Sequence, residues 1–197
     1  MNSPKRQGKL FPKNKSPNCI SAPQQELRLS KEILKSWQER IHNHQSKLFK
    51  GVPSDHQQGS LFAKIETNSI DEFKPLKLTP LPLTFWKWPK GTHHGPAIYV
   101  VMDRLENNAS HILLYVGETI AADRRWKGEH DCKSYLAAYS EALGSAGLQN
   151  QISIRFWSDV PEKTQSRRRL EQQLIHRWLP PFNKETRGRW STPFTAN

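Results

Sequence analysis

Two short apolar runs, AIYVVMD at 97–103 and HILLYVGE at 111–118, constrain the fold of this chain more than any other feature. Both are rich in β-branched and aromatic residues, and the stretch RLENNAS between them is typical of a turn. They predict two antiparallel strands of a β-hairpin with a long loop. Each run carries one tyrosine, Tyr99 in the first and Tyr115 in the second, so the hairpin would bring two phenols close together.

The chain after the hairpin predicts helices and one more strand. Gly117 is expected to end the second strand in a tight turn, and Thr119 to cap the helix that follows. The later elements are recognised by helical spacing of apolar residues, by strict alternation, and by the stop that Pro180-Pro181 imposes. They are a helix over 120–127, a helix over 131–147, a strand over 151–157 and a helix over 164–179. The expected fold is α/β (α+β), in the order β-β-α-α-β-α, with a small three-stranded sheet flanked by helices.

The part of the chain before the hairpin has a different composition. Its first residues are rich in Pro, Lys, Asn, Ser and Gln and predict a disordered basic arm. A helix is expected from Ser30, and the prolines after it predict an extended segment that lies over another part of the fold. The expected organisation is the arm at 1–26, the helix and Pro-rich segment at 27–94, a compact domain at 95–185 and a tail at 186–197.

The charge of the chain indicates an anionic partner. Lys and Arg total 30 against 18 Asp and Glu, which gives a formal charge of +12. Nucleic acid is the expected partner and an anionic membrane surface the second choice. No apolar run is long enough to cross a membrane, and the basic start has no signal-peptide core, so a cytoplasmic location is expected. The two distant cysteines, Cys19 and Cys132, agree with a reducing compartment.

One acidic residue in the last predicted helix is unusual. Glu171 is the only acid there, and it borders the apolar face formed by Leu170, Leu174 and Ile175. A carboxylate in such a place is costly unless it is paired or binds a metal ion. From the helix alone, an i,i+4 pair with Arg167 is the simpler interpretation and a metal ligand the alternative.

Five features in order resemble the GIY-YIG nuclease superfamily. They are AIY, with Ala97 where the family has glycine; Tyr115-Val116-Gly117; Arg125, ten positions after Tyr115; Glu171 in a later helix; and Asn183, twelve positions beyond it. The resemblance covers roughly residues 95–185, which would form a GIY-YIG-like nuclease domain. His130 lies five positions after Arg125, whereas a related histidine in several members lies four after.

The resemblance implies a metal-dependent endonuclease that hydrolyses phosphodiester bonds in DNA. It assigns a divalent cation, Mg²⁺ or Mn²⁺, to Glu171 and a phosphate to Arg125. It assigns the general base to Tyr99 and an orienting role to Tyr115, and this order could be reversed. Asn183 would hold the site by hydrogen bonds, and His130 is a further candidate. Two other functions stay open, a nucleic-acid-binding module that does not cleave and an adaptor that docks an acidic protein.

Further basic residues are candidates for contacts to nucleic acid. Arg167, Arg168 and Arg169 form a run that either grips phosphates or marks a solvated helix face. Arg124 neighbours Arg125, but residues next to each other on a helix point about 100° apart, so only one should face the catalytic groove. The candidates in the N-terminal arm are Lys5, Arg6, Lys9, Lys13 and Lys15.

Overall fold

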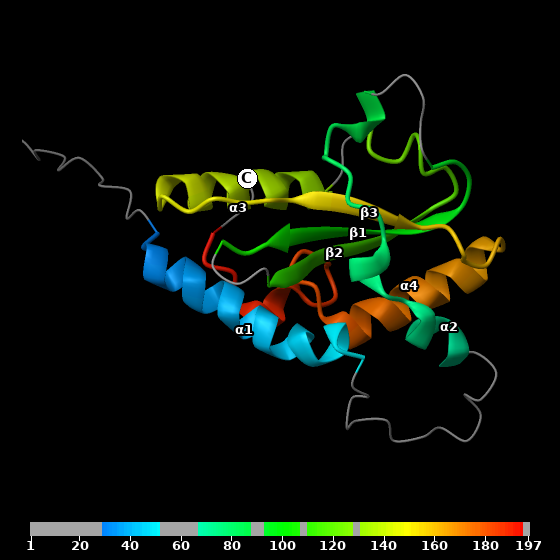
Figure 1. Ribbon diagram of the computed structural model, residues 1–197, viewed down its shortest axis with the longest axis horizontal. Helices are drawn as coiled ribbons and strands as arrows, with labels where there is room; N and C mark the ends of the chain where they lie inside the picture. The colour runs from blue at the N-terminus through cyan, green and yellow to red at the C-terminus, as the bar shows by residue number, and fades with distance from the viewer. Residues whose placement is uncertain (1–28, 52–66, 88–92, 107–109, 128–130, 195–197) are drawn as a thin grey trace, which may run out of the picture.

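The computed structural model describes residues 29–51, 67–87, 93–106, 110–127 and 131–194. The helices are α1 (Lys31–Phe49), α2 (Thr67–Glu72), α3 (Asp131–Ser145) and α4 (Thr164–Trp178), with short 3-10 helices at η1 (Pro75–Lys77), η2 (Phe85–Lys87) and η3 (Arg187–Trp190). The strands are β1 (Ala97–Arg104), β2 (His111–Thr119) and β3 (Ser153–Trp157). The predicted α+β fold is confirmed (Figure 1).

The sheet has the order β2-β1-β3, and both pairs of neighbours are antiparallel. The predicted hairpin of β1 and β2 and the predicted third strand are therefore confirmed. Tyr99 lies opposite Gly117 on β2 and opposite Phe156 on β3. The register of the hairpin shifts by one residue between Val101 and Met102, which is a β-bulge.

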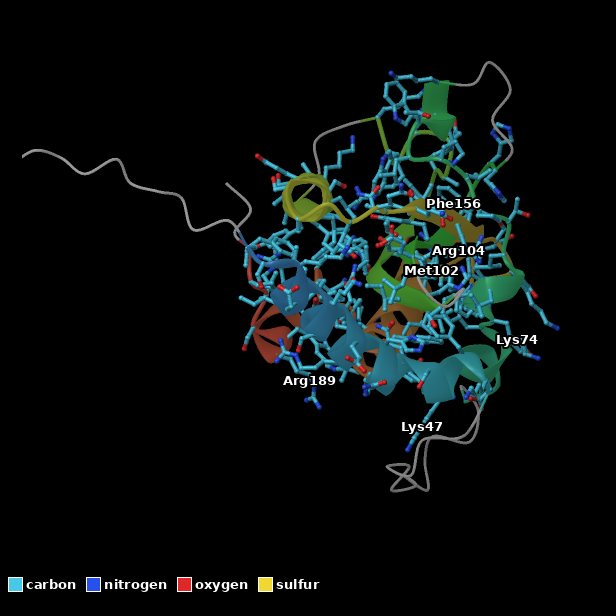
Figure 2. The ribbon with its side chains drawn as sticks, turned by 60° about the vertical axis from the view of Figure 1, so that its left-hand side comes forward. Lys47, Lys74, Met102, Arg104, Phe156 and Arg189 are labelled. Atoms are coloured by element: carbon cyan, nitrogen blue, oxygen red, sulfur yellow. The ribbon has the colours of Figure 1, made fainter. Side chains whose placement is uncertain are left out.

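Helices cover both faces of this sheet, so β1 is buried on both sides along almost its whole length. Residues on one face, such as Tyr99 and Val101, pack with α3 and the first half of α1. Residues on the other face, such as Ile98 and Val100, pack with α4. Figure 2 places Met102, from this second face, in the interior of the molecule. The alternation follows from the two-residue period of a strand.

α1 belongs to the same core as the hairpin. Leu34, Trp37 and Ile41 are buried with the residues of β1 and β2. The helix begins where it was expected, and Ser30 caps it. The buried side chain of Gln45 bonds to both the amide and the carbonyl of Leu113 on β2 and to the carbonyl of Trp178 at the end of α4. The expected start of the compact domain near Gly95 is therefore wrong, because α1 covers the outer edge of β2.

Two other expected boundaries also change. The Pro-rich segment, expected to lie over another part of the fold, pairs with the edge of the sheet, where Leu81 exchanges two hydrogen bonds with Ile154 on β3. The expected tail at 186–197 contributes Trp190 to the core. Both segments are held because their apolar side chains have buried partners. The compact unit thus extends from α1 to at least η3.

The expected helix over 120–127 is a series of turns. Thr119 bonds through its hydroxyl to the amide of Ala121, only two residues away. The amide of Ala122 donates to the carbonyl of Gly95, just before β1, so it is not available to a regular helix. Tertiary contacts prevail here because so short a helix has little stability of its own.

Several expectations concern residues that the structure does not describe. The disordered arm at 1–26, with Lys5, Arg6, Lys9, Lys13 and Lys15, lies outside the described residues. His130 does too. Among the residues that are described, no helix combines the length and the apolar character needed to cross a bilayer.

Candidate active site

The two tyrosines lie on the same face of the hairpin. Tyr99 stands opposite Gly117, and Tyr115 is two residues before that glycine, so the two rings are diagonal neighbours across the strands. Their ring centroids are 5.9 Å apart with an interplanar angle of 29°. Tyr99 is fully buried, whereas Tyr115 is partly exposed. The hairpin therefore forms a two-layered pair, with Tyr99 behind Tyr115.

Gly117 is required by the ring of Tyr99. A β-carbon at position 117 would overlap the end of that ring and its hydroxyl group. The expectation that Gly117 ends the strand in a turn is wrong, because β2 continues to Thr119. The glycine instead leaves the space into which the phenol of the neighbouring strand fits.

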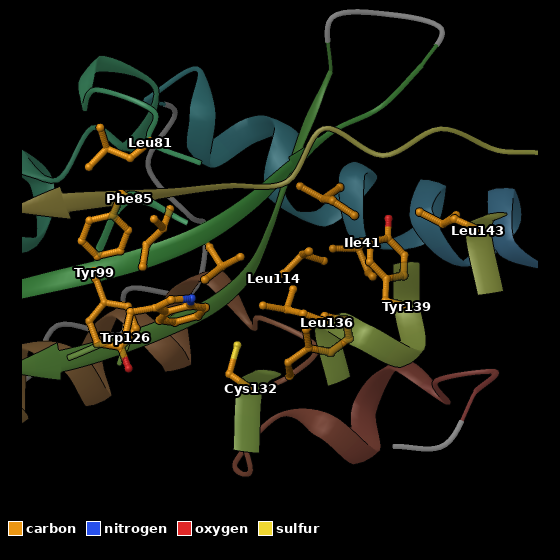
Figure 3. Packing of buried hydrophobic residues seen from close by; sticks show 14 of the residues in the cluster. Ile41, Leu81, Phe85, Tyr99, Leu114, Trp126, Cys132, Leu136, Tyr139 and Leu143 are labelled. Atoms are coloured by element: carbon orange, nitrogen blue, oxygen red, sulfur yellow. The ribbon is translucent and has the colours of Figure 1, made fainter. Parts of the chain in front are cut away.

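Arg125 bonds to Tyr99 from the series of turns after β2. Its Nε atom donates to the Tyr99 hydroxyl over 3.2 Å, and its guanidinium lies 5.7 Å from the centre of the ring. Arg124 points elsewhere, with 76% of its side chain exposed. Trp126, the next residue, packs edge-on against Tyr99 at 6.0 Å, and Figure 3 shows the two side chains close together in the apolar cluster. The neighbours thus fix both the ring and the hydroxyl of Tyr99.

The hydroxyl oxygen of Tyr99 accepts a hydrogen bond from Arg125, and the hydroxyl of the neighbouring Tyr115 lowers the pKa of Tyr99. Burial raises the pKa of Tyr99 to about 12, although the charge and the hydrogen bond of Arg125 act in the opposite direction. Burial, followed by the neighbouring Tyr99, raises the pKa of Tyr115 further above its ordinary value. Within the pair, negative charge is therefore best held on the Tyr99 oxygen.

Glu171 reaches the other side of β2 from α4. Its Oε1 atom accepts a hydrogen bond from the amide of Glu118 over 3.0 Å, and no described residue donates to its Oε2 atom. Burial raises the pKa of Glu171 to about 7; the Glu118 amide lowers it, and the charges of Glu118 and Glu185 raise it. One carboxylate oxygen is thus held by the strand, while the other has no donor among the residues that the structure describes.

The simpler interpretation of Glu171, a pair with Arg167, is wrong. The fully buried guanidinium of Arg167 pairs with Glu118 over 3.0 Å and bonds to the carbonyls of Pro161 and Glu162. Burial also excludes Arg167 from contact with nucleic acid as the protein stands. Arg168, on the exposed face, lies 3.3 Å from the same Glu118 carboxylate. Arg169 is exposed on that face as well.

Asn183 holds β2 by hydrogen bonds to its backbone, between the tyrosines and Glu171. Its side-chain oxygen accepts from the amide of Val116 over 2.9 Å, and its side-chain nitrogen donates to the carbonyl of Val116 over 2.8 Å. Asn183 is almost fully buried. It therefore acts on the backbone between Tyr115 and Gly117, and its side-chain hydrogen bonds go to Val116 and not to Glu171 or a tyrosine hydroxyl.

A pocket of about 410 Å³ opens where these groups meet. Tyr115, Arg125, Glu171 and Asn183 line it, and Tyr99 lies behind this surface. A larger hollow of about 610 Å³ lies between the end of α1 and α2, far along α4 from the tyrosines. Its single carboxylate, Asp71, is paired with Arg177. We therefore place the candidate chemistry in the smaller pocket.

Two carboxylates line the pocket, Glu171 and Glu185, and Glu185 accepts a hydrogen bond from Gln172. Among the described residues, no three His, Cys, Asp or Glu side chains are grouped as a metal site. Mg²⁺ often binds through one or two carboxylates and keeps several waters, so the Oε2 atom of Glu171 fits that ion. It does not fit zinc, which takes three or four protein ligands. Because the pKa of Glu171 is raised, a cation would have to displace its proton at neutral pH.

Two residues of the site were missed by sequence reasoning. Glu118, directly after Gly117, holds Arg167 through its carboxylate and Glu171 through its amide. Arg187, which lies beyond the expected domain end at 185, lines the pocket. The first could have been suspected from an acid at the end of an apolar strand. Nothing in the sequence separates Arg187 from the other basic residues near it.

Comparisons of this chain with protein-family models, with curated proteins and with solved structures gave no match in any of the three.

Proposed function

We propose that this protein is a metal-dependent endonuclease that hydrolyses phosphodiester bonds in DNA, with the GIY-YIG type of site that the sequence resembles. One observation carries the proposal. Tyr115, Arg125 and Glu171, which are far apart in the sequence, line a single pocket, and the oxygen of Tyr99 behind them accepts a hydrogen bond from Arg125. The positive charge of the chain supports an anionic substrate.

The tyrosine pair would act on the attacking water as a unit. Tyr115 meets the water, because it lines the pocket and Tyr99 does not. Negative charge is held on Tyr99, where Arg125 and the Tyr115 hydroxyl stabilise it. With a pKa of about 12, the phenolate of Tyr99 lies about 7 kcal/mol above the phenol at pH 7, at about 1.36 kcal/mol per pKa unit. That cost is large, so the substrate and its counterions must contribute.

Arg125 and Glu171 would act on the phosphate from two sides. The guanidinium of Arg125 lines the pocket and has the planar donors that match phosphate oxygens. Glu171 would hold the divalent cation through its Oε2 atom. When bound, such a cation supplies positive charge for the departing 3′ oxygen. Asn183 keeps the strand that carries Tyr115 in register with Glu171.

Nicking of supercoiled plasmid DNA in Mg²⁺ or Mn²⁺, with EDTA as the control, tests the proposal. We expect the full chain to nick the plasmid and the Glu171→Gln variant to be inactive while it still binds DNA within a few-fold of the wild type, because phosphate contacts dominate affinity. Glu141→Gln, at an exposed acid on α3, is the matched control and should be fully active. Binding of DNA by the wild type without any nicking would overturn the proposal in favour of a binding module.

A further inference from the structure

A second arginine, Arg187, enters the pocket from the C-terminal side. It begins η3 and lines the same pocket as Arg125 and Glu171. Its Nε and Nη2 atoms are buried and have no hydrogen-bond partner. Its guanidinium forms no ion pair with any described carboxylate; Glu185, the nearest acid in the sequence, accepts instead from Gln172. Within the described part of the chain Arg187 therefore makes no direct ion pair, although Glu171 and Glu185 line the same pocket.

The position of this charge is fixed by two contacts. The guanidinium lies 4.0 Å from the centre of the Tyr135 ring, and that ring stacks on Phe182 with centroids 5.6 Å apart. The amide of Arg187 donates to the carbonyl of Asn183 over 2.9 Å. Since Asn183 also clamps β2 beside Tyr115, the backbone of Arg187 is tied to the strand that forms the site.

Two nitrogen atoms of Arg187 lack a hydrogen-bond acceptor among the described residues, and a bound ligand could provide one. Buried nitrogen atoms without an acceptor are rare, and each one needs an explanation such as a ligand or an ordered water. Tyr135 stabilises the positive charge through its ring face but offers no acceptor to the edge of the guanidinium. An anion arriving in the pocket would neutralise the charge, and it would accept from the guanidinium once the side chain turns toward the pocket.

We propose that Arg187 binds a second phosphate of the nucleic acid, next to the phosphate that is cleaved. The proposal rests on the proposed function, because it takes the occupant of the pocket to be the substrate. Arg125 also lines the pocket but bonds to Tyr99, so Arg187 is a separate anchor and not a substitute for it. A polynucleotide carries a phosphate at every nucleotide, so it always offers such a neighbour.

The test is the salt dependence of binding to one duplex, measured in EDTA so that no cleavage occurs. Each phosphate neutralised on duplex DNA contributes about 0.9 to the log–log slope of affinity against salt. We expect Arg187→Ala to lower the slope by about 0.9. Arg187→Lys should keep it, because lysine retains the charge. Arg189→Ala is the matched control on the same 3-10 helix; Figure 2 shows Arg189 projecting from the surface, and its slope should equal that of the wild type.

Other results would overturn the inference. An unchanged salt slope in Arg187→Ala, or an equal loss of slope in Arg189→Ala, would do so. So would a reduced slope in an Arg187→Lys variant that unfolds at the wild-type temperature. A wild type that does not bind duplex DNA would also overturn it. A lysine variant that unfolds at a lower temperature and also loses slope would assign Arg187 a purely structural role and would overturn it as well. The plasmid-nicking assay is read separately, so failure of the nuclease proposal and failure of this one can be told apart.

Discussion

Replacing Glu171 by glutamine should stabilise the protein while it destroys the candidate site. The carboxylate is largely buried, and the charges of Glu118 and Glu185 oppose its ionisation. Glutamine has the same shape and can still accept the hydrogen bond from the amide of Glu118. The substitution therefore removes an unfavourable charge without leaving that amide unpaired.

The magnitude follows from the pKa of Glu171. A rise from the ordinary 4.5 to about 7 corresponds to about 3 kcal/mol at about 1.36 kcal/mol per pKa unit. Because the side chain is partly exposed and solvent screens it, we expect about half of this, roughly 1.5 kcal/mol. The folded wild type binds the proton more tightly than the unfolded chain, so its stability falls as the pH rises from 4.5 to 7. The difference should be absent at pH 4 and complete at pH 8.

Thermal unfolding in EDTA at both pH values measures this effect. At pH 8 the midpoint of Glu171→Gln should lie about 3–6 °C above that of the wild type, and at pH 4 the two should agree. Glu141→Gln, at an exposed position on α3, should match the wild type at both pH values. Adding Mg²⁺ at pH 8 should raise the midpoint of the wild type alone, because binding to the folded state stabilises it. A glutamine variant that is no more stable than the wild type at pH 8 would refute the view of Glu171 as a charge held at a cost.

Arg125→Ala should lower the plasmid-nicking rate at least a hundred-fold, which is the scale for loss of one preorganised charge-stabilising group. Arg124→Ala should lower the rate far less, because only Arg125 bonds to Tyr99 and lines the pocket. Gly117→Ala should destabilise the fold by about 1–3 kcal/mol in urea unfolding, since the new β-carbon overlaps the ring of Tyr99. Gly144→Ala, in an open position on α3, should be neutral or stabilising. Equal effects of the two substitutions would argue against the fit of the Tyr99 ring against Gly117. Arg167→Ala should cost about 3–5 kcal/mol, because it leaves the partly buried carboxylate of Glu118 with only the exposed Arg168 as a partner; a wild-type midpoint would contradict the structural role of this arginine.

The strands and the long helices could be predicted because their signals are local. β1, β2 and β3 are apolar runs with strand composition, and α1 and α4 repeat apolar residues at helical spacing. The turns after β2 could not be predicted, because the bond from Ala122 to Gly95 is a tertiary contact that leaves no trace in the local sequence. The same holds for the role of α1, whose Gln45 reads as an ordinary polar residue of a surface helix.

Four residues chosen from the sequence lie around one pocket, but their contacts were only partly predicted, and their roles stay predictions. The grouping of Tyr115, Arg125, Glu171 and Asn183 around one pocket agrees with the spacing from which they were chosen. The contacts of each residue were harder to predict from the sequence. An arginine run on a helix looks solvated, yet the buried carboxylate of Glu118 draws Arg167 inside. The partner of Arg167 is Glu118 on β2 and not Glu171 four residues along the same helix. That choice depends on how the helix packs on the sheet, which the sequence of the helix alone does not reveal.

The outer edge of β2 has a consequence for how this protein avoids aggregation. An edge strand with free amides and carbonyls is a template on which a second copy can build a sheet. Here the edge is closed by side chains instead of a fourth strand: Gln45 takes both groups of Leu113 and Asn183 both groups of Val116, while Glu171 takes the amide of Glu118. Two residues of the candidate site thus also occupy the place of a neighbouring strand. A chain without Asn183 and Glu171 would expose unpaired amides and carbonyls along β2. The two residues therefore cover the strand edge against self-association and also line the pocket.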